Sequence, residues 1–129
     1  MGNNIDKIKQ DKFAKFCGIK LIKVADGSSV VEMELKEEHL NGIGAVHGAV
    51  IFAIADYAFA AAANSREVIS VGINASITYF KAPMGKKLKG IAKEISIYKK
   101  ISGYDVLVLD EDDTVIAKFN GTAYRKIKK

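Results

Sequence analysis

The sequence predicts an α+β fold in which one buried helix packs against a strongly curved antiparallel sheet. The helix is predicted from an apolar run, Ala49 to Ala63, whose one charged residue is Asp56. This run is too short to cross a bilayer, because about fifteen helical residues reach only about 22 Å. A helix that is apolar all round is typically buried at the centre of a domain. The sheet is predicted from alternating apolar and polar residues on both sides of the run.

Two elements are expected before the central helix, which we place at about residues 47–64. Apolar residues at loosely helical spacing predict one short amphipathic N-terminal helix over residues 7–17 that rests on the main body: Ile8, Phe13, Phe16 and Cys17. After a turn at Asp26-Gly27, Val31, Met33 and Leu35 alternate with glutamates. This pattern predicts a strand from Ser28, the last one before the helix.

Four strands are expected after the helix. The first spans about residues 70–79 and ends near Pro83-Met84-Gly85. Its alternation places Val71, Ile73, Ala75, Ile77 and Tyr79 on one face and Ser70, Gly72, Asn74, Ser76 and Thr78 on the other. Further strands are predicted at 88–99, 104–110 and 114–124, with links at Ser102-Gly103 and at the acidic residues 111–113. Such short links predict an antiparallel meander.

Length and composition are those of one domain. The chain has 129 residues, 49% hydrophobic and 27% charged, with no internal repeat or linker. We therefore expect a single domain over residues 1–129, with a core at about 13–124 and a basic tail at 125–129. The one cysteine, Cys17, cannot form an intramolecular disulfide, and the N-terminal residues lack the apolar core of a signal peptide. A cytoplasmic location is expected, with no membrane partner.

The segment Asn41-Gly-Ile-Gly-Ala-Val-His47-Gly48-Ala49 is the candidate reaction centre. A glycine-rich polar loop that leads into a helix offers free backbone N–H donors. An acid such as Asp56 within an apolar helix is costly to bury, and a role in a reaction would explain its presence. The loop is not a dinucleotide-binding fingerprint, because His47 takes the third glycine position and no parallel βαβ pattern surrounds it. Two histidines and one distant cysteine do not form a zinc site, so no metal is expected.

The order and spacing of these residues resemble the hot-dog-fold acyl-CoA thioesterases, and the subfamily they resemble most is the phenylacetate-degradation (PaaI-like) type. The resemblance spans residues 13–124. It is carried by Asn41, by His47-Gly48 six residues later, and by Asp56. The strand Ile77-Thr-Tyr-Phe-Lys-Ala-Pro83 is also similar to a family strand that ends in proline. The resemblance implies hydrolysis of an acyl-CoA thioester without a metal or redox cofactor, in a homodimer or a homotetramer built from dimers.

Some candidate substrate-binding residues follow from the comparison with the family pattern. Ala49 stands where a second glycine is common, which keeps the N–H donor but narrows the space above the helix start. Gly72 and Asn74 are the positions comparable to a hydroxyl residue that assists the acid in some relatives. Lys81, Lys86 and Lys87 surround the bend at Pro83 and could meet the phosphates of coenzyme A or be solvated surface charge. Four aromatic residues are candidate walls of an acyl pocket, or core: Phe52, Tyr57, Phe59 and Phe80.

The chemistry of thioester hydrolysis assigns roles to the candidate catalytic residues Asn41, His47, Gly48 and Asp56. Negative charge develops on the carbonyl oxygen, and N–H donors of Gly48 and Ala49 at a helix start would stabilise it. Asp56 could act as general base or as nucleophile. Each residue also has a structural interpretation: Asp56 as a hydrogen-bonded acid, His47 as a helix cap, and Asn41 as a turn residue before Gly42.

Helix geometry adds a constraint on these roles. Gly48 and Asp56 are eight residues apart on one helix, so they lie about 12 Å apart along its axis. One thioester carbon cannot contact both. If both act on one substrate, Gly48 of one subunit must face Asp56 of another, as side-by-side helices in a two-fold dimer would allow.

Other functions remain open at this stage. A hydroxyacyl-thioester dehydratase or hydratase on the same fold would use His47 as the base. A non-catalytic acyl-CoA-binding module would bind CoA esters without turnover. Nucleic-acid binding is disfavoured, because the net charge of +5 resides largely in the basic tail and no recognisable reading element accompanies it.

Overall fold

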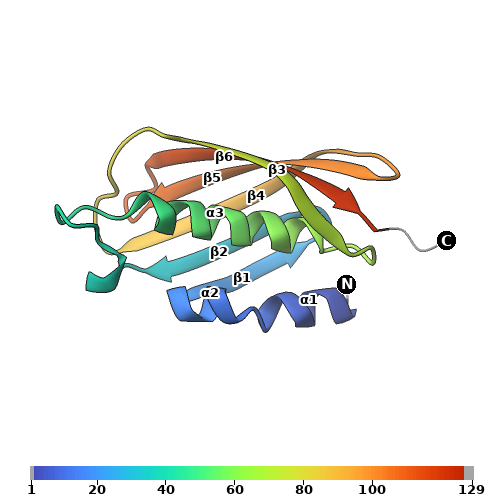
Figure 1. Ribbon diagram of the computed structural model, residues 1–129, viewed down its shortest axis with the longest axis horizontal. Helices are drawn as coiled ribbons and strands as arrows, with labels where there is room; N and C mark the ends of the chain where they lie inside the picture. Colours follow the sequence, from blue (N-terminus) through green and yellow to red (C-terminus); the bar gives the residue numbers. More distant parts are fainter. Residues whose placement is uncertain (1, 127–129) are drawn as a thin grey trace.

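One six-stranded antiparallel sheet lies against helix α3 (Gly48–Ala63), as Figure 1 shows. The structure is a computed structural model and describes residues 2–126. The strand order is β1-β2-β4-β5-β6-β3. The strands are β1 (Ile19–Ala25), β2 (Ser28–Glu34), β3 (Ser70–Tyr79), β4 (Lys87–Ile97), β5 (Ile101–Asp110) and β6 (Val115–Arg125). A short 3₁₀ helix, η1 (Glu37–His39), follows β2. This is the predicted α+β architecture, the hot-dog fold.

The sheet is only partly a meander. Strands β4, β5 and β6 follow one another through short links as predicted, and β1 and β2 form a hairpin. Strand β3 does not pair with the next strand, β4; it crosses to the far edge and pairs with β6. Strand β1 is not among the predicted strands, because a bulge between Leu21 and Lys23 interrupts its alternation.

The N-terminal region forms two helices, not the predicted one. Helix α1 (Gly2–Lys9) ends before Asp11, whose carboxylate accepts a hydrogen bond from Ala14 N–H and caps helix α2 (Lys12–Cys17). Ala14 is the buried residue of α2, whereas Phe13 and Phe16 are 64% and 87% exposed. The N-terminal helices thus rest on the main body as predicted, with Ile8 and Cys17 packed against the core, but Phe13 and Phe16 of the predicted apolar face do not take part.

The predicted alternation of β3 holds over only part of the strand. Its register with β6 shifts between Gly72 and Asn74. After the shift, Ile77 packs against the core, as predicted for its face, but before it the inward position is Gly72 and not Val71. The bulged residue changes the parity of the strand, which a strict two-residue period cannot anticipate.

Phe59 is the core residue that fixes how closely β3 and β6 approach α3. Its ring contacts Tyr104 and Phe119 at centroid distances of 5.6 and 5.7 Å. A Cβ atom at Gly121 would lie 2.7 Å from the Phe59 ring, and one at Gly72 would lie 2.9 Å from it. These glycines therefore make room for the ring at the sheet surface.

The bend between β3 and β4 is held by Asp110 at the end of β5. Its buried carboxylate accepts backbone hydrogen bonds from Met84 at 3.0 Å, and from Asp112 and Thr114 at 3.0 and 3.1 Å. These bonds, that from Met84 foremost, lower the pKa of Asp110 from its ordinary value. One side chain thus joins the segment after Pro83 to the β5–β6 turn.

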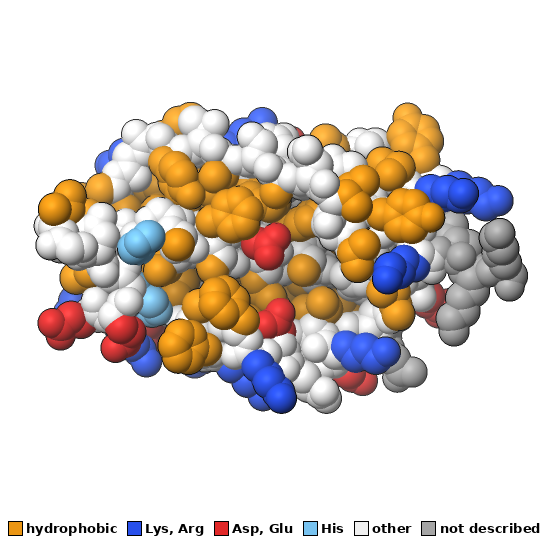
Figure 2. All heavy atoms as spheres, in the orientation of Figure 1, with side chains coloured by type: hydrophobic (Ala, Val, Ile, Leu, Met, Phe, Trp, Pro, Cys, Tyr) orange, Lys and Arg blue, Asp and Glu red, His pale blue; other side chains and the backbone are white. Residues whose placement is uncertain are grey.

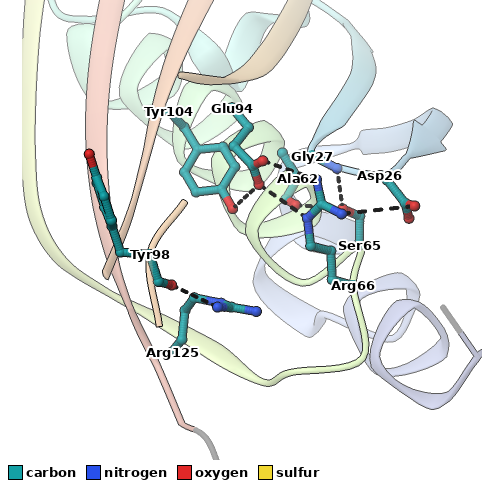
Figure 3. Close-up of polar contacts among 9 residues, drawn as sticks. All are labelled: Asp26, Gly27, Ala62, Ser65, Arg66, Glu94, Tyr98, Tyr104 and Arg125. Carbon is teal, nitrogen blue, oxygen red and sulfur yellow. Dashed lines mark hydrogen bonds and ion pairs between the residues drawn. The ribbon is translucent and has the colours of Figure 1, made fainter. Parts of the chain in front are cut away.

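A polar network holds the C-terminal end of α3 against the sheet (Figure 3). Ser65 Oγ accepts a hydrogen bond from Gly27 N–H at 2.7 Å, which joins the helix end to the β1–β2 turn. Arg66 donates two hydrogen bonds to the Glu94 carboxylate on β4, at 3.0 and 3.3 Å, and Tyr104 Oη donates to the same group. The helix is therefore fixed at this end by charged and polar contacts as well as by the core.

Among residues 2–126, no helix has the length and apolar character needed to cross a membrane.

Replacement of Gly121 by alanine is expected to destabilise the fold by about 1–3 kcal/mol, because the new methyl group overlaps the Phe59 ring. Urea unfolding measures this cost. Gly103→Ala is the matched strand control, since a Cβ there first meets Ser96 Oγ at 3.3 Å. A Gly121→Ala protein as stable as the wild type would show that the ring does not limit the approach of β6.

Candidate active site

Asn41 organises the loop that leads into α3. Its side-chain Oδ1 accepts hydrogen bonds from the N–H groups of Ile43 and Ala45, both at 3.0 Å. Leu40 and Val46 form an isolated antiparallel bridge that closes the same loop. The turn role considered for Asn41 is thus present in the structure, and its amide nitrogen meets no acceptor among the described residues. That NH₂ group is available to a ligand.

His47 is the N-cap of α3. Its Nδ1 accepts a hydrogen bond from Ala49 N–H at 3.0 Å, so this nitrogen is unprotonated and the ring proton is on Nε2. His47 is exposed. The two N–H groups expected to act as donors therefore differ: that of Ala49 is already used, whereas that of Gly48 has no acceptor within residues 2–126. Gly48 N–H is the free donor at the helix start.

Tyr79 on β3 contacts the same helix start. Its hydroxyl donates a hydrogen bond to the Gly48 carbonyl oxygen at 3.1 Å. A Cβ atom at Gly48 would lie 3.5 Å from the Tyr79 ring, which is an ordinary contact. The end of β3 and the start of α3 are thus in direct contact, although Tyr79 itself is 48% exposed.

Asp56 lies on the side of α3 that faces away from the core. Solvent reaches its side chain, yet partial burial among apolar neighbours raises the pKa of its carboxyl above the ordinary value, and the charge of Asp11 adds to this effect. Figure 2 shows an acidic side chain set into a largely hydrophobic face over this helix, and a second one below it towards the N-terminal helices. A carboxylate with a raised pKa is a stronger base than an ordinary one.

Helix α3 is less buried than predicted. An open stripe runs along it through Ala49, Ala53, Asp56 and Ala60, spaced three to four residues apart on one face. The opposite side, with Ile51, Ile54 and Ala58, is buried against the sheet. All members of the stripe except Asp56 are alanines, so a partner could approach the helix closely along it.

The structure joins some of the predicted site residues and separates others. Asn41, His47, Gly48 and Ala49 gather at the start of α3, and Asp56 lies two turns further along the same helix. The axial separation of Gly48 and Asp56 remains about 12 Å, because one uninterrupted helix joins them. One chain therefore presents two separate groups.

Gly72 and Asn74 face opposite sides of the sheet. Gly72 lies opposite the buried Ala123 and points toward Phe59 of α3. Beyond the bulge, Asn74 lies opposite Thr122, on the face turned away from α3. Within one chain, Asn74 is therefore separated from the start of α3 and from Asp56 by the sheet.

The predicted residues around the β3–β4 bend lie at the surface. Phe80 is 58% exposed, Lys81 is exposed and Pro83 is partly buried. The N–H groups of Phe80 and Lys81 both donate to Ile116 carbonyl oxygen, at 2.8 and 3.4 Å. Lys86 and Lys87 are exposed on the same connection. This region keeps its positive charge in solvent.

Three of the four aromatic residues considered as pocket walls belong to the core. Tyr57 and Phe59 are 6% and 3% exposed, and Phe52 packs edge-on against Phe119 at a centroid distance of 5.4 Å. Their structural interpretation is therefore correct.

A groove of about 580 Å³ lies instead between α2 and the first turns of α3, lined in part by Phe13, Phe16 and Ala53. Sequence reasoning missed it, although two phenylalanines three residues apart on a short helix were a usable signal.

His39 has a structural position. It is buried, its Nδ1 accepts from Lys36 N–H at 2.9 Å, and its Nε2 lies 2.9 Å from Cys17 carbonyl oxygen. Both ring nitrogens are thus engaged in fixing η1 against the end of α2. Within the described part of the chain, no group of three or more His, Cys, Asp or Glu side chains could hold a metal ion.

Comparisons with known proteins agree with this architecture. The family model of the thioesterase superfamily matches residues 43–117. A candidate esterase from Archaeoglobus fulgidus is 39% identical over 118 residues, covering 91% of this chain and 77% of the relative. Acyl-coenzyme A thioesterase PaaI from Escherichia coli is 30% identical over 118 residues, covering 91% of this chain and 84% of PaaI.

Solved structures give the same result. The E. coli PaaI protein from the phenylacetic acid degradation operon superimposes with a TM-score of 0.91 at 27% identity, covering 98% of this chain and 93% of PaaI. A mutant of PaaI from Thermus thermophilus superimposes with a TM-score of 0.84 at 32% identity, covering 89% and 99%. The chain therefore belongs to the thioesterase superfamily, as a thioester hydrolase with a PaaI-like hot-dog fold.

Proposed function

We propose that this protein is an acyl-CoA thioesterase that hydrolyses an acyl- or aryl-acyl-CoA to the free acid and CoA. The observation that carries the proposal is the pair of reactive groups on the open side of α3: the free N–H of Gly48 and the carboxyl of Asp56, whose pKa is raised. The family supports thioester chemistry, and the acyl-CoA substrate is that named for the relative PaaI.

In the proposed reaction, Asp56 removes a proton from water, and the hydroxide adds to the thioester carbonyl carbon. The carbonyl oxygen becomes an oxyanion, which the Gly48 N–H at the helix N-terminus stabilises. The C–S bond then breaks, and the departing CoA thiolate takes up the proton held by Asp56. Direct attack by the Asp56 carboxylate, followed by hydrolysis of the anhydride, is the alternative use of the same group. Neither route needs a metal or redox cofactor.

Because Gly48 and Asp56 of one chain are about 12 Å apart, we propose that the site forms between two subunits. Two features of the monomer support a dimer. Strand β3 is an edge strand with large exposed apolar residues, among them Val71 and Ile73 at 40% and 56% exposure. Such an edge offers unpaired backbone groups to a second strand. The alanine stripe of α3 would let two helices lie side by side, and further pairing into a tetramer is part of the same expectation.

The loop residues have supporting roles in this proposal. Asn41 keeps the loop in shape with Oδ1 and offers its NH₂ group to the water or the carbonyl. His47 holds the helix start through Nδ1, which leaves Nε2–H as a second donor beside Gly48. A hydratase would need a basic nitrogen on His47; in this tautomer the nitrogen that could serve, Nδ1, already accepts from Ala49. Lys81, Lys86 and Lys87 are the cations proposed to meet the CoA phosphates. We also propose that the protein is located in the cytoplasm.

The substitution Asp56→Asn is expected to lower kcat for thiol release by about 10²-fold or more, because a neutral amide cannot accept the proton of water. A colorimetric thiol assay over aromatic and straight-chain acyl-CoAs measures this loss, and size-exclusion chromatography checks that the oligomer is intact. Asp105→Asn is the control, since Asp105 lies on β5 and contacts Asn120 and Lys118. Normal turnover by the Asp56→Asn protein would refute the proposal.

The pH profile of kcat/KM should rise through a pKa above the ordinary aspartate value of about 4. The base is active when deprotonated, and partial burial together with Asp11 raises the pKa of Asp56, so activity falls on the acid side earlier than for an exposed carboxylate. Rates measured from pH 4 to pH 8 test this. A profile that stays flat down to pH 4 would exclude Asp56 as the titrating base.

The contribution of Gly48 N–H can be removed with little other change. Proline has no N–H and is favoured at the first helical position, and His47 has the extended conformation that proline requires before it (φ −64°, ψ 134°). We expect Gly48→Pro to lower kcat by about 10²–10³-fold. Gly48→Ala keeps the N–H and meets Tyr79 at an ordinary distance, so it should stay active. Equal activities of the two variants would exclude this donor.

A further inference from the structure

The side chain of Tyr79 ties the start of α3 to the end of β3. Its hydroxyl donates to the Gly48 carbonyl oxygen at 3.1 Å. A carbonyl in the first turn of a helix is the usual acceptor for the N–H group four residues later, so Tyr79 adds a donor from outside the helix. This bond therefore lies directly beside the N–H group proposed to stabilise the oxyanion.

The peptide group between Gly48 and Ala49 is held at both ends by side chains. Tyr79 binds its carbonyl oxygen, and His47 Nδ1 accepts from its N–H at 3.0 Å. The preceding peptide group carries the free N–H of Gly48. It is held at its carbonyl end, because the His47 oxygen accepts from two N–H groups of the first turn, at 3.0 and 3.4 Å. Since each peptide group is planar, holding both of them fixes the direction of the Gly48 N–H.

Gly48 is a position where such a restraint matters. Glycine has more backbone freedom than any other residue. The conformation of Gly48 does not require that freedom, because the residue is helical and its φ is not positive. A Cβ atom there would first meet the Tyr79 ring, at 3.5 Å. The hydroxyl of Tyr79 thus restrains a backbone that Gly48 itself leaves free.

The sheet in turn fixes the position of Tyr79. Tyr79 lies opposite the buried Ala117 of β6, and the N–H of the next residue, Phe80, donates to the Ile116 carbonyl oxygen at 2.8 Å. Two residues earlier, Ile77 packs against the core. The backbone is therefore held before and after Tyr79, and the hydroxyl reaches α3 from a fixed point.

We propose that Tyr79 is a positioning residue of the thioesterase, whose hydroxyl fixes the start of α3 so that the Gly48 N–H points at the developing oxyanion. This inference rests on the proposed function and adds a residue to that same site. In the proposed dimer, Asp56 comes from the second chain, which meets the first at the β3 edge. A tyrosine at the end of β3 aligns the donor with the strand that meets the partner. It acts through Gly48 and does not itself contact the substrate.

The substitution Tyr79→Phe removes the hydroxyl and keeps the ring. We expect kcat for thiol release from hexanoyl-CoA and benzoyl-CoA to fall by about tenfold, with KM changed by less than about twofold, because the donor acts mainly on the transition state. Tyr98→Phe is the matched control. It removes an exposed hydroxyl between β4 and β5 and should leave both constants unchanged. Size-exclusion chromatography checks that the oligomer is intact.

Double variants test whether Tyr79 acts through the Gly48 N–H. In the Gly48→Pro protein this N–H is absent, so adding Tyr79→Phe should lower kcat no further. In the Gly48→Ala protein the new side chain restricts the backbone, so the loss caused by Tyr79→Phe should shrink to about threefold or less. A tenfold loss in the Gly48→Pro background would overturn the proposal.

Hydrogen exchange of the Ala49 amide tests the restraint without substrate. Loss of the Tyr79 hydroxyl leaves the peptide group held from one side only, so its bond to His47 should open more often. We expect the exchange measured by NMR to be several times faster in Tyr79→Phe and unchanged in Tyr98→Phe.

The outcomes separate this inference from the proposed function. A wild type that releases thiol, with a kcat that Tyr79→Phe leaves unchanged, would overturn the role of Tyr79 and leave the thioesterase in place. A wild type that releases no thiol would refute the activity, while faster Ala49 exchange in Tyr79→Phe would still support the restraint. A selective loss of kcat that vanishes in the Gly48→Pro background would establish Tyr79 as a positioning residue.

Discussion

The rigid rise of helix α3 is the constraint on which the rest of the account depends. A continuous helix from Gly48 to Ala63 holds a free N–H donor at its start and a carboxyl group of raised pKa two turns later. The distance of about 12 Å between the Gly48 N–H and the Asp56 carboxyl cannot be closed by side-chain rotation, because both residues belong to one continuous helix. The reaction proposed here must therefore use the groups of two chains. The exposed β3 edge and the alanine stripe are what a second chain would need.

The remainder of the fold keeps this helix in place. The Phe59 ring packs against the glycines of β3 and β6. The hydrogen bonds of Ser65 and Arg66 hold the C-terminal end of α3 against the sheet. At the other end, His47 caps the helix through its side chain and Tyr79 reaches the Gly48 carbonyl. The N–H of Gly48 remains free because the first N–H groups of a helix have no acceptor within the helix, and the His47 side chain accepts from the following residue. A capped donor and an open donor therefore lie at adjacent positions of the helix start.

The sequence predicts the fold well where periodicity and turn residues act locally. The central helix is confirmed within a residue of its expected ends, and β2, β4, β5 and β6 lie close to their predicted ranges. The crossing of β3 to the far edge beside β6 is a long-range pairing that no local pattern encodes. No local pattern encodes the bulge after Gly72 either, and this bulge turns Asn74 away from α3.

Only part of the candidate site could be predicted from the sequence. The spacing of Asn41, His47, Gly48 and Asp56 identified the loop and the helix, since these residues are close along the chain. The use of Ala49 N–H by His47 depends on a side-chain conformation, and the groove beside α2 depends on how two helices pack. The aromatic residues of the central helix were candidate walls of an acyl pocket. The structure buries Tyr57 and Phe59 in the core, and Phe52 packs against Phe119.

The division of the site between two subunits is tested most directly by pairing two inactive chains. Gly48→Pro and Asp56→Asn chains with different affinity tags are co-expressed, and the mixed dimer is purified through both tags. If Gly48 of one chain acts with Asp56 of the other, one site of the mixed dimer carries both changes and the second carries neither. Thiol release should then return to about half of the wild-type rate. A mixed dimer as inactive as either parent would contradict the account.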